Sequence, residues 1–347
     1  MNPFLFRLFR SNETHIHELN YLFWECTTRC NLHCRHCGSD CSVHAREPDM
    51  PLEDFLRALD TIPKKAIPAE FTIVLTGGEP LLRPDIEACG RAFRARHLSW
   101  SLVSNGFFYD ASMQERLLAA GLGALTISLD GLEEEHNRMR GHRESFSRAI
   151  QAIRLAAAAP HLAFDVVTCV TRRNLAQLPQ LRCLLEAAGV RRWRLFTVIP
   201  IGRAAADPQM RLLPEEHVRL LEFIASCRRE EGRLPAASFS CEGYVGPYED
   251  KVRDTPFFCH AGINIASVLI DGRICACPDI DRDVFSQGNI RTDSLWEVWN
   301  TRFGPFRDRS WAKKGICADC RAFKDCLGGG MHNWHGACEA PLTCSLP

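Results

Sequence analysis

Five cysteines lie within residues 26–41, in the stretch CTTRCNLHCRHCGSDC. Cys30, Cys34 and Cys37 form a C-x3-C-x2-C frame, whereas a competing C-x2-C-x3-C frame begins at Cys34 and ends at Cys41. Thiolates at such short spacings bind metals or take part in thiol–disulfide exchange. The stretch is therefore a candidate metal or redox centre.

Three kinds of chemistry suit these clustered thiols. A structural zinc site needs four ligands, usually from two C-x2-C pairs, and Cys34 with Cys37 has no second pair nearby. A thioredoxin-like redox pair would not need the surrounding cysteines. Three thiolates on one loop instead suit an iron–sulfur cluster whose fourth iron is open to a substrate or cofactor. The frame beginning at Cys30 provides such a set. Cys26 and Cys41 are left over, and we expect them to pack as bystanders, with substrate contact or a transient disulfide as the alternative.

The elements that would position these thiols alternate regularly. Continuous apolar runs are each followed by a stretch of helical period, which predicts a parallel sheet buried on both faces. In such folds, the loops at the carboxyl ends of the strands build the active site. We therefore expect an α/β fold in which the cysteine run and several glycine-bearing turns meet at one pocket. The predicted strands are 21–26, 71–78, 100–106, 124–131, 162–171 and 191–200, and the predicted helices are 51–62, 84–97, 111–121, 143–158, 175–188 and 214–230.

Composition limits the functional classes. Lys+Arg and Asp+Glu both total 42, so no net charge favours nucleic acid or an anionic membrane as partner. No apolar run is long enough to span a bilayer, and MNPFLFRLFR lacks a signal-peptide core. A chain of 347 residues does not need disulfides, so its 18 cysteines indicate metal binding in a reducing compartment. We expect a cytoplasmic protein without membrane or nucleic-acid partners.

CNLHCRHC at 30–37 and GGEP at 77–80 together resemble the radical S-adenosylmethionine (radical SAM) superfamily, with His36 in a slot that is usually aromatic. The resemblance implies a partial (β/α)6 TIM-like barrel and S-adenosylmethionine as cofactor. Reductive cleavage of this cofactor would give a 5′-deoxyadenosyl radical that abstracts hydrogen from the substrate. The resemblance also implies a [4Fe-4S] cluster with one open iron, held by Cys30, Cys34 and Cys37.

By the same resemblance, residues at the strand ends bind S-adenosylmethionine. Gly77 and Gly78 would let the backbone approach the methionyl ammonium, and Glu79 supplies a carboxylate of the right sign. Arg140 in HNRMRG would clamp the methionyl carboxylate. The purely structural alternatives are that the two glycines only form a tight turn and that Arg140 is only a surface charge. The expected set, including backbone near adenine in PIGRA, is His36, Gly77, Gly78, Glu79, Pro80, Ser104, Asn105, Ser128, Asp130, Arg140 and Ile199.

The C-terminal third contains C-x12-G-x4-C from Cys259 to Cys277 and C-x2-C-x5-C from Cys317 to Cys326. These spacings resemble the SPASM domain, which carries auxiliary iron–sulfur clusters, with a zinc-only domain as the alternative. A hairpin around Asp271-Gly272 would present Cys277. We expect an N-terminal segment, a radical SAM barrel and a SPASM domain, at 1–20, 21–235 and 236–347.

One or two auxiliary clusters, of the [4Fe-4S] type, are expected. Gly330 stands where fully ligated SPASM proteins usually carry a further cysteine. The fourth iron of the first cluster would then be open to a substrate thiolate or amide, or bound by Cys275 or Cys338. The expected ligands are Cys241, Cys259 and Cys277 for the first cluster, and Cys317, Cys320, Cys326 and Cys344 for the second, with Cys338 as a rival to Cys344.

Asp279 is a candidate catalytic base. In sulfatase-maturing members the base is an aspartate directly after the cysteine that corresponds to Cys277, whereas here Pro278 intervenes. This displacement weakens the prediction of sulfatase maturation, which remains a second alternative.

SPASM proteins most often modify peptides, so the leading hypothesis is radical modification of a peptide or protein. About twenty residues precede the first strand, too few for a recognition domain, so a separate recognition protein is a possible partner. A flavodoxin or ferredoxin is the expected reductant. The alternative substrate is a tetrapyrrole in haem-type cofactor synthesis. A non-catalytic electron-transfer protein would keep the cysteines but would not need GGEP or Arg140.

Overall fold

The computed structural model describes residues 2–39, 41–45, 47–230, 232–336 and 338–346. Within these residues, ten strands form one sheet in the order β10-β9-β8-β1-β2-β3-β4-β5-β6-β7. Their bounds are β1 Tyr21–Thr27, β2 Thr72–Gly77, β3 Ser99–Ser104, β4 Leu122–Ser128, β5 Ala163–Val170, β6 Arg192–Thr197, β7 Ala236–Phe239, β8 Ile265–Val268, β9 Arg273–Cys275 and β10 Gly288–Asn289.

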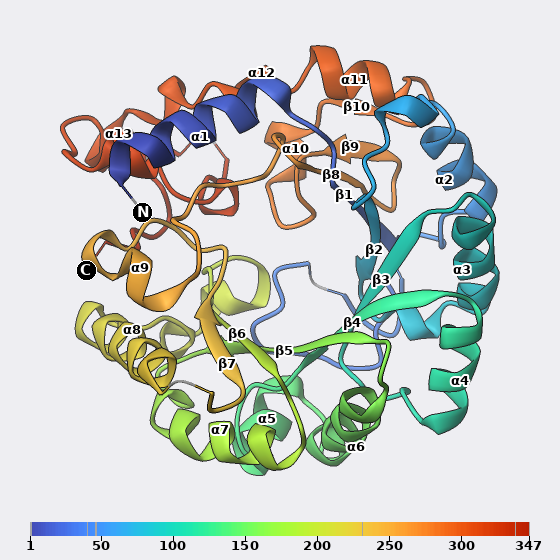
Figure 1. Cartoon of the computed structure of the whole chain (residues 1–347), viewed down its shortest axis with the longest axis horizontal. Coiled ribbons are helices and arrows are strands. Elements are labelled where there is room, and N and C mark those ends of the chain that lie inside the picture. Colours follow the sequence, from blue (N-terminus) through green and yellow to red (C-terminus); the bar gives the residue numbers. More distant parts are fainter. Residues whose placement is uncertain (1, 40, 46, 231, 337, 347) are drawn as a thin grey trace.

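Strands β1 to β6 follow one another in the sheet and pair in parallel throughout. The sheet curves into an arc, and helices cover its outer side (Figure 1). This confirms the predicted α/β fold with a partial barrel. The covering helices are α2 Leu52–Leu59, α3 Ile86–Ala95, α4 Ala111–Ala119, α5 Glu133–Arg140, α6 Ser145–Ala158, α7 Leu178–Ala187 and α8 Pro214–Arg229.

The C-terminal third extends the sheet at both ends. β7 pairs in parallel with β6, and β8 pairs in parallel with β1, where Tyr21 is opposite Ile265. β8 and β9 form an antiparallel hairpin around Asp271 and Gly272, as the D-G turn predicts. The remaining helices of this part are α9 Glu249–Val252, α10 Arg282–Phe285, α11 Leu295–Thr301, α12 Gly304–Arg307 and α13 Phe323–Cys326.

Helix α1, Pro3–Ile16, forms where the sequence indicated only an N-terminal segment. It lies beside α12 and α13, which are far from it in sequence (Figure 1). Arg7 forms an ion pair with Asp325 at 2.7 Å, and Arg10 donates to the carbonyls of Lys324 and Asp325. The start of the chain therefore packs directly on the cysteine-rich end.

Aromatic side chains join the sheet to its helices. Trp24 of β1 stacks on Phe55 of α2 with ring centroids 4.3 Å apart, and Phe93 of α3 meets both rings edge-on. All three are fully buried, and each contributes roughly 1.5–3 kcal/mol through burial. This packing fixes the strand that leads into the cysteine run.

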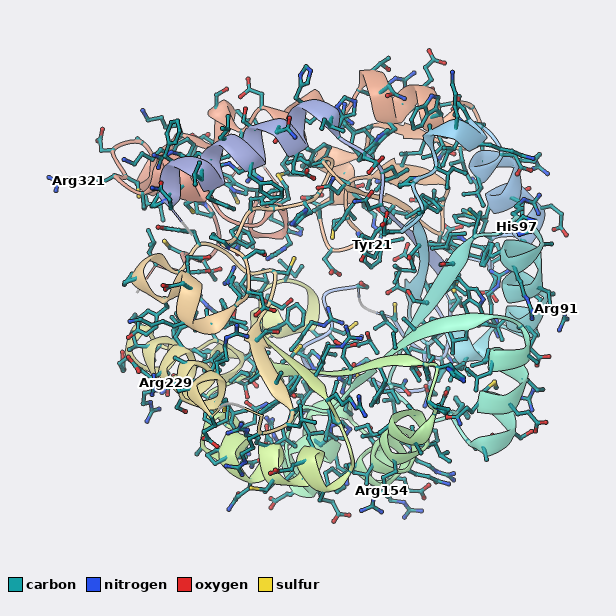
Figure 2. The ribbon with its side chains drawn as sticks, viewed as in Figure 1. Tyr21, Arg91, His97, Arg154, Arg229 and Arg321 are labelled. Carbon is teal, nitrogen blue, oxygen red and sulfur yellow. The ribbon has the colours of Figure 1, made fainter. Side chains whose placement is uncertain are left out.

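Charged side chains occupy the outer rim. Arg91, Arg154 and Arg229 extend away from the sheet on its helical side (Figure 2). Within the described residues, no helix is both long and apolar enough to cross a membrane.

Candidate active site

The cysteine run leaves β1 at the carboxyl end of the sheet and forms a closed loop. Cys30 and Cys34 are buried, and Cys37 is partly buried. The amide of Cys30 donates to the carbonyl of Ser42 at 2.7 Å, which ties the two ends of the loop together. Arg29 forms an ion pair with Asp49. The three predicted cluster cysteines thus lie on one anchored loop, as a three-thiolate site requires.

The two glycines of GGEP lie directly beneath this loop. The amide of Gly78 donates to the carbonyl of Thr27, and the amide of Glu79 donates to that of Arg29, each at 2.8 Å. A Cβ on Gly77 or on Gly78 would lie 2.1 Å from one of these carbonyl oxygens. Gly77 also has φ of 123°, which side chains rarely adopt. Close approach of the cysteine loop therefore accounts for both glycines.

Glu79 is fully buried and joins the ends of β2 and β3. Its carboxylate accepts from the hydroxyl of Ser104 and from the amide of Asn105, each at 2.8 Å. Burial raises the pKa of Glu79 to about 6. It also caps the short helix that begins at Pro80, by accepting from the amide of Leu81.

Asn105 links this turn to the cysteine loop, because its side-chain amide donates to Asn31 Oδ1 at 3.0 Å and lies 4.0 Å from Cys30 Sγ. The structure thereby brings Gly77, Gly78, Glu79, Pro80, Ser104 and Asn105 to the same loop.

Asp130 and Arg140 form a buried pair against the cysteine loop. Arg140 Nε donates to Asp130 Oδ2 at 2.6 Å, and Arg140 Nη1 lies 3.8 Å from Cys34 Sγ. The other carboxylate oxygen of Asp130 accepts from the amide of Cys169. Burial opposes the charge of Asp130, but the guanidinium of Arg140 holds the pKa of that carboxyl below its usual value. Arg140 is thus buried beside a cluster cysteine, not on the surface.

His36 lies 4.0 Å from the Asp130 carboxylate. Burial lowers the pKa of His36 to about 4, so the ring is neutral near pH 7. Nδ1 is buried and has no hydrogen-bond partner among the described residues. Ser128, at the end of β4, is partly buried.

The turn after β6 holds the far end of the cysteine loop. Arg203 Nε donates to the carbonyl of Cys34 at 2.7 Å, and its Nη1 donates to that of Cys41 at 3.2 Å. A Cβ on Gly202 would lie 2.5 Å from the carbonyl oxygen of Cys37. Ile199, expected near adenine, belongs to this turn and is partly buried. The sequence predicts no role for Arg203, although the GR of PIGRA marks its turn.

The two spare cysteines of the run differ in their surroundings. Cys26 is buried in the core and lies 3.4 Å from the carbonyl of Thr76. Burial raises its pKa far above the usual value, so the thiol is unreactive. Cys41 is also buried, and its thiol lies within hydrogen-bonding reach of the thiol of Cys37.

The C-terminal cysteines form two groups. Burial raises the pKa of Cys277, and the charges of Asp279, Cys241 and Cys259 raise it further, so these three thiols and Asp279 are neighbours. The second group lines one pocket and consists of Cys317, Cys320, Cys326 and Cys344. The two groups match the sets expected to hold the auxiliary clusters.

The two other candidate thiols lie elsewhere. Cys275 is buried in the main core, where the charges of Arg282 and Asp271 act on its thiol. Cys338 does not line the pocket that Cys344 enters.

Asp279 lies between the cysteine loop and the first C-terminal group. Its side chain is exposed, yet the protein atoms around it, followed by the charge of Cys37, raise its pKa. This position is compatible with the predicted role as a base near the reacting groups.

Comparisons with known proteins agree with this geometry. Residues 24–181 match the radical SAM superfamily, and residues 259–321 match the SPASM iron–sulfur cluster-binding domain. An AdoMet-dependent heme synthase of Oleidesulfovibrio alaskensis is 26% identical, over 91% of this chain and 81% of its own. The mycofactocin maturase MftC of Mycobacterium tuberculosis is 29% identical, over 89% of this chain and 78% of its own.

The fold has counterparts among solved structures. SuiB of Streptococcus suis, bound to its precursor peptide SuiA, superposes with a TM-score of 0.70 at 16% identity, over 93% of this chain and 74% of its own. Membership of the two matched families implies S-adenosylmethionine and iron–sulfur clusters as cofactors. The chain belongs to the radical SAM superfamily and is an enzyme of that superfamily with a C-terminal SPASM domain.

Proposed function

We propose that this enzyme holds a [4Fe-4S] cluster through Cys30, Cys34 and Cys37 and uses S-adenosylmethionine to start radical chemistry on a peptide or protein. The observation that carries the proposal is the convergence of three segments, each following a different strand, on the cysteine loop. Gly78 after β2, Arg140 after β4 and Arg203 after β6 all contact its backbone or thiols. With both cofactors bound, the site supplies a 5′-deoxyadenosyl radical.

The residues of the chain position and shield that chemistry. The polar groups of Glu79, Asn105 and Asp130 lie at the strand ends around the loop, where they would orient the methionyl and ribose groups. Arg140 would attract the methionyl carboxylate while it neutralises Asp130. The buried thiols of Cys30 and Cys34 would keep water away from the reacting groups. A flavodoxin or ferredoxin would serve as reductant.

Two features support a peptide or protein substrate. The mycofactocin maturase matches most of this chain at 29% identity. SuiB, whose fold is shared, has been solved with a precursor peptide bound. A separate recognition protein would assist binding. Asp279, between the loop and the first auxiliary group, is the proposed base.

A tetrapyrrole is the second candidate substrate. Relatives named AdoMet-dependent heme synthase match the chain at 25–26% identity over 88–93% of its length. Anaerobic sulfatase maturation is a weaker candidate, because Asp279 lies one residue late for that role.

The first test is formation of 5′-deoxyadenosine after anaerobic reconstitution with iron and sulfide, reduction, and addition of S-adenosylmethionine. The combined variant C30A/C34A/C37A should form none and should lose about four of about twelve irons per chain. C183A is the matched control, since Cys183 is exposed on α7 and lies outside the site. Undiminished 5′-deoxyadenosine in the triple variant would refute the proposed ligands.

The substrate test uses hydrogen transfer. A peptide encoded beside the gene, prepared with deuterated side chains, should transfer deuterium into 5′-deoxyadenosine. Deuterium transfer from a deuterated iron coproporphyrin, and none from the peptide, would favour a tetrapyrrole as the substrate.

A further inference from the structure

The first auxiliary group provides three cysteine ligands, one fewer than a four-iron cluster can bind. Cys241, Cys259 and Cys277 are mutual neighbours. A four-iron cluster with a complete protein shell needs a fourth ligand. The two cysteines expected as alternatives do not supply it, since Cys275 lies in the main core among Arg282, Asp271 and Arg273 and no described contact brings Cys338 to this group.

His332 has a buried ring nitrogen that is free to bind a metal. Its Nε2 is buried and has no hydrogen-bond partner within the described part of the chain. Buried polar atoms without a partner are uncommon and call for an explanation. The ring lies over Gly330, where an added Cβ would be 2.5 Å from Cε1 and 2.9 Å from Nε2. The imidazole therefore fills the space that a side chain at position 330 would occupy.

The segment that carries His332 touches the three-cysteine group on two sides. The amide of Met331 donates to Cys259 Sγ at 3.4 Å. The amide of Gly330 donates at 3.4 Å to the carbonyl of Glu242, the residue after Cys241. The buried guanidinium of Arg309 contacts Cys259, and its charge also acts on His332. These contacts place the backbone on either side of His332 beside the group.

Two nearby carboxylates are less suitable as the fourth ligand. Glu242 Oε2 accepts from the hydroxyl of Thr197 at 2.8 Å, so the side chain is directed toward the end of β6. Asp279 is exposed, and its charge interacts with Cys37 as well as with Cys277, so it lies between the cysteine loop and the group, where the proposed base is needed. Imidazole nitrogen, by contrast, is an established iron–sulfur ligand that replaces cysteine in Rieske centres.

We propose that His332, through Nε2, is the fourth protein ligand of the auxiliary cluster held by Cys241, Cys259 and Cys277. The inference rests on the proposed function, because it requires that this cluster is present. It replaces the expectation of an iron open to substrate at this cluster. A neutral imidazole carries one negative charge less than a thiolate, so the potential of the cluster is higher than that of a four-cysteine counterpart.

The test is pulsed electron paramagnetic resonance of the reduced, reconstituted enzyme without S-adenosylmethionine. Protein labelled with ¹⁵N in the histidine rings should show a ¹⁵N coupling to a cluster, where unlabelled protein shows a ¹⁴N coupling. H332A should lose this coupling. H332C should retain the iron, lose the nitrogen coupling and shift the cluster to a lower potential. H335A is the matched control, because His335 is close in sequence but pairs with Asp281, and it should keep the coupling.

The possible outcomes distinguish a failure of this inference from a failure of the proposed function. About twelve irons per chain with no histidine coupling would overturn the assignment of His332 and leave the three-cluster enzyme intact. A coupling that persists in H332A would overturn it as well. A count of about eight irons per chain, in which the missing cluster is the one at Cys241, Cys259 and Cys277, would overturn the proposal that this cluster exists.

Discussion

Arg140 lies against Asp130 in the interior of the barrel, with Nε 2.6 Å from Oδ2, while its Nη1 reaches to 3.8 Å from Cys34 Sγ. The pair therefore connects the end of β4 to a proposed cluster ligand. Arg140 is 7% exposed and Asp130 is not exposed at all, so each charge depends on the other for compensation.

Substitution of Arg140 by methionine should leave the buried carboxylate of Asp130 without its partner. We expect a loss of about 3–5 kcal/mol in the free energy of unfolding, measured by denaturant titration. R148M is the control, since Arg148 is half-exposed, with a 4.0 Å contact to Glu144 and its guanidinium 5.5 Å from the centre of the Phe107 ring, and its effect should stay within about 1 kcal/mol. Equal stability of R140M and R148M would contradict the buried pair.

Gly78→Ala should displace the cysteine loop. Its Cβ would lie 2.1 Å from the carbonyl oxygen of Arg29, a backbone atom that cannot rotate away. We expect the loss of about four irons per chain and of 5′-deoxyadenosine formation, measured by iron assay and chromatography. Gly123→Ala is the control, because the nearest atom to its Cβ would be 3.6 Å away. Full iron occupancy in G78A would show that the loop does not depend on this approach.

Glu79 should make stability depend on pH. Its pKa is about 6 in the fold against 4.5 for the free side chain, so the native state binds the proton more tightly than the unfolded state. The contribution of Glu79 to the free energy of unfolding is therefore highest below about pH 4.5. It falls by about 2 kcal/mol in total as the pH rises to about 6, and then levels off. Denaturant titrations of the wild type and E79Q between these values should show that E79Q lacks this decline. E87Q, at a partly buried site on α3, should titrate like the wild type. Parallel curves for E79Q and the wild type would contradict the prediction.

Asp279→Asn should separate cofactor cleavage from substrate modification. The base would act only after hydrogen abstraction, so 5′-deoxyadenosine should still form while modified product falls by about 10²–10⁴-fold. Mass spectrometry of the substrate and chromatography of 5′-deoxyadenosine measure the two in one reaction. D283N is the control, since Asp283 is exposed and pairs with Arg273. Normal product yield in D279N would exclude Asp279 as the base.

The sequence was a good guide to elements that depend on local pattern. The expected strand at 162–171 corresponds to β5 at Ala163–Val170, and the helix at 214–230 corresponds to α8. Continuous apolar runs and amphipathic repeats predict these elements because each must bury one face. Helix α5, EEEHNRMR, has no such repeat, and we had treated it only as a motif. It is held by a specific contact, in which His136 Nδ1 accepts from the amide of Asp130.

The parts of the site that were missed depend on contacts between distant segments. Arg203 acts on the carbonyls of residues more than 160 positions earlier in the chain. His332 is notable only because Gly330 leaves space for its ring. PIGRA marks the turn that carries Arg203 but not its partners, and His332 has no local signature, because the spacing of residues in a sequence does not specify which loops will face each other.

The pairing of β1 with β8 has a consequence for how the chain is made. β1 is the first strand to leave the ribosome, but one of its edges stays unpaired until residues 265–268 have been synthesised. Its buried carboxylate, Glu25, likewise lacks its ion-pair partner until Arg282 has been synthesised, and the two lie 2.9 Å apart in the finished fold. An unpaired apolar edge is a site for aggregation. Ribosome-bound chains that end after β7 should therefore depend on chaperones, and completion of the C-terminal third relieves that dependence.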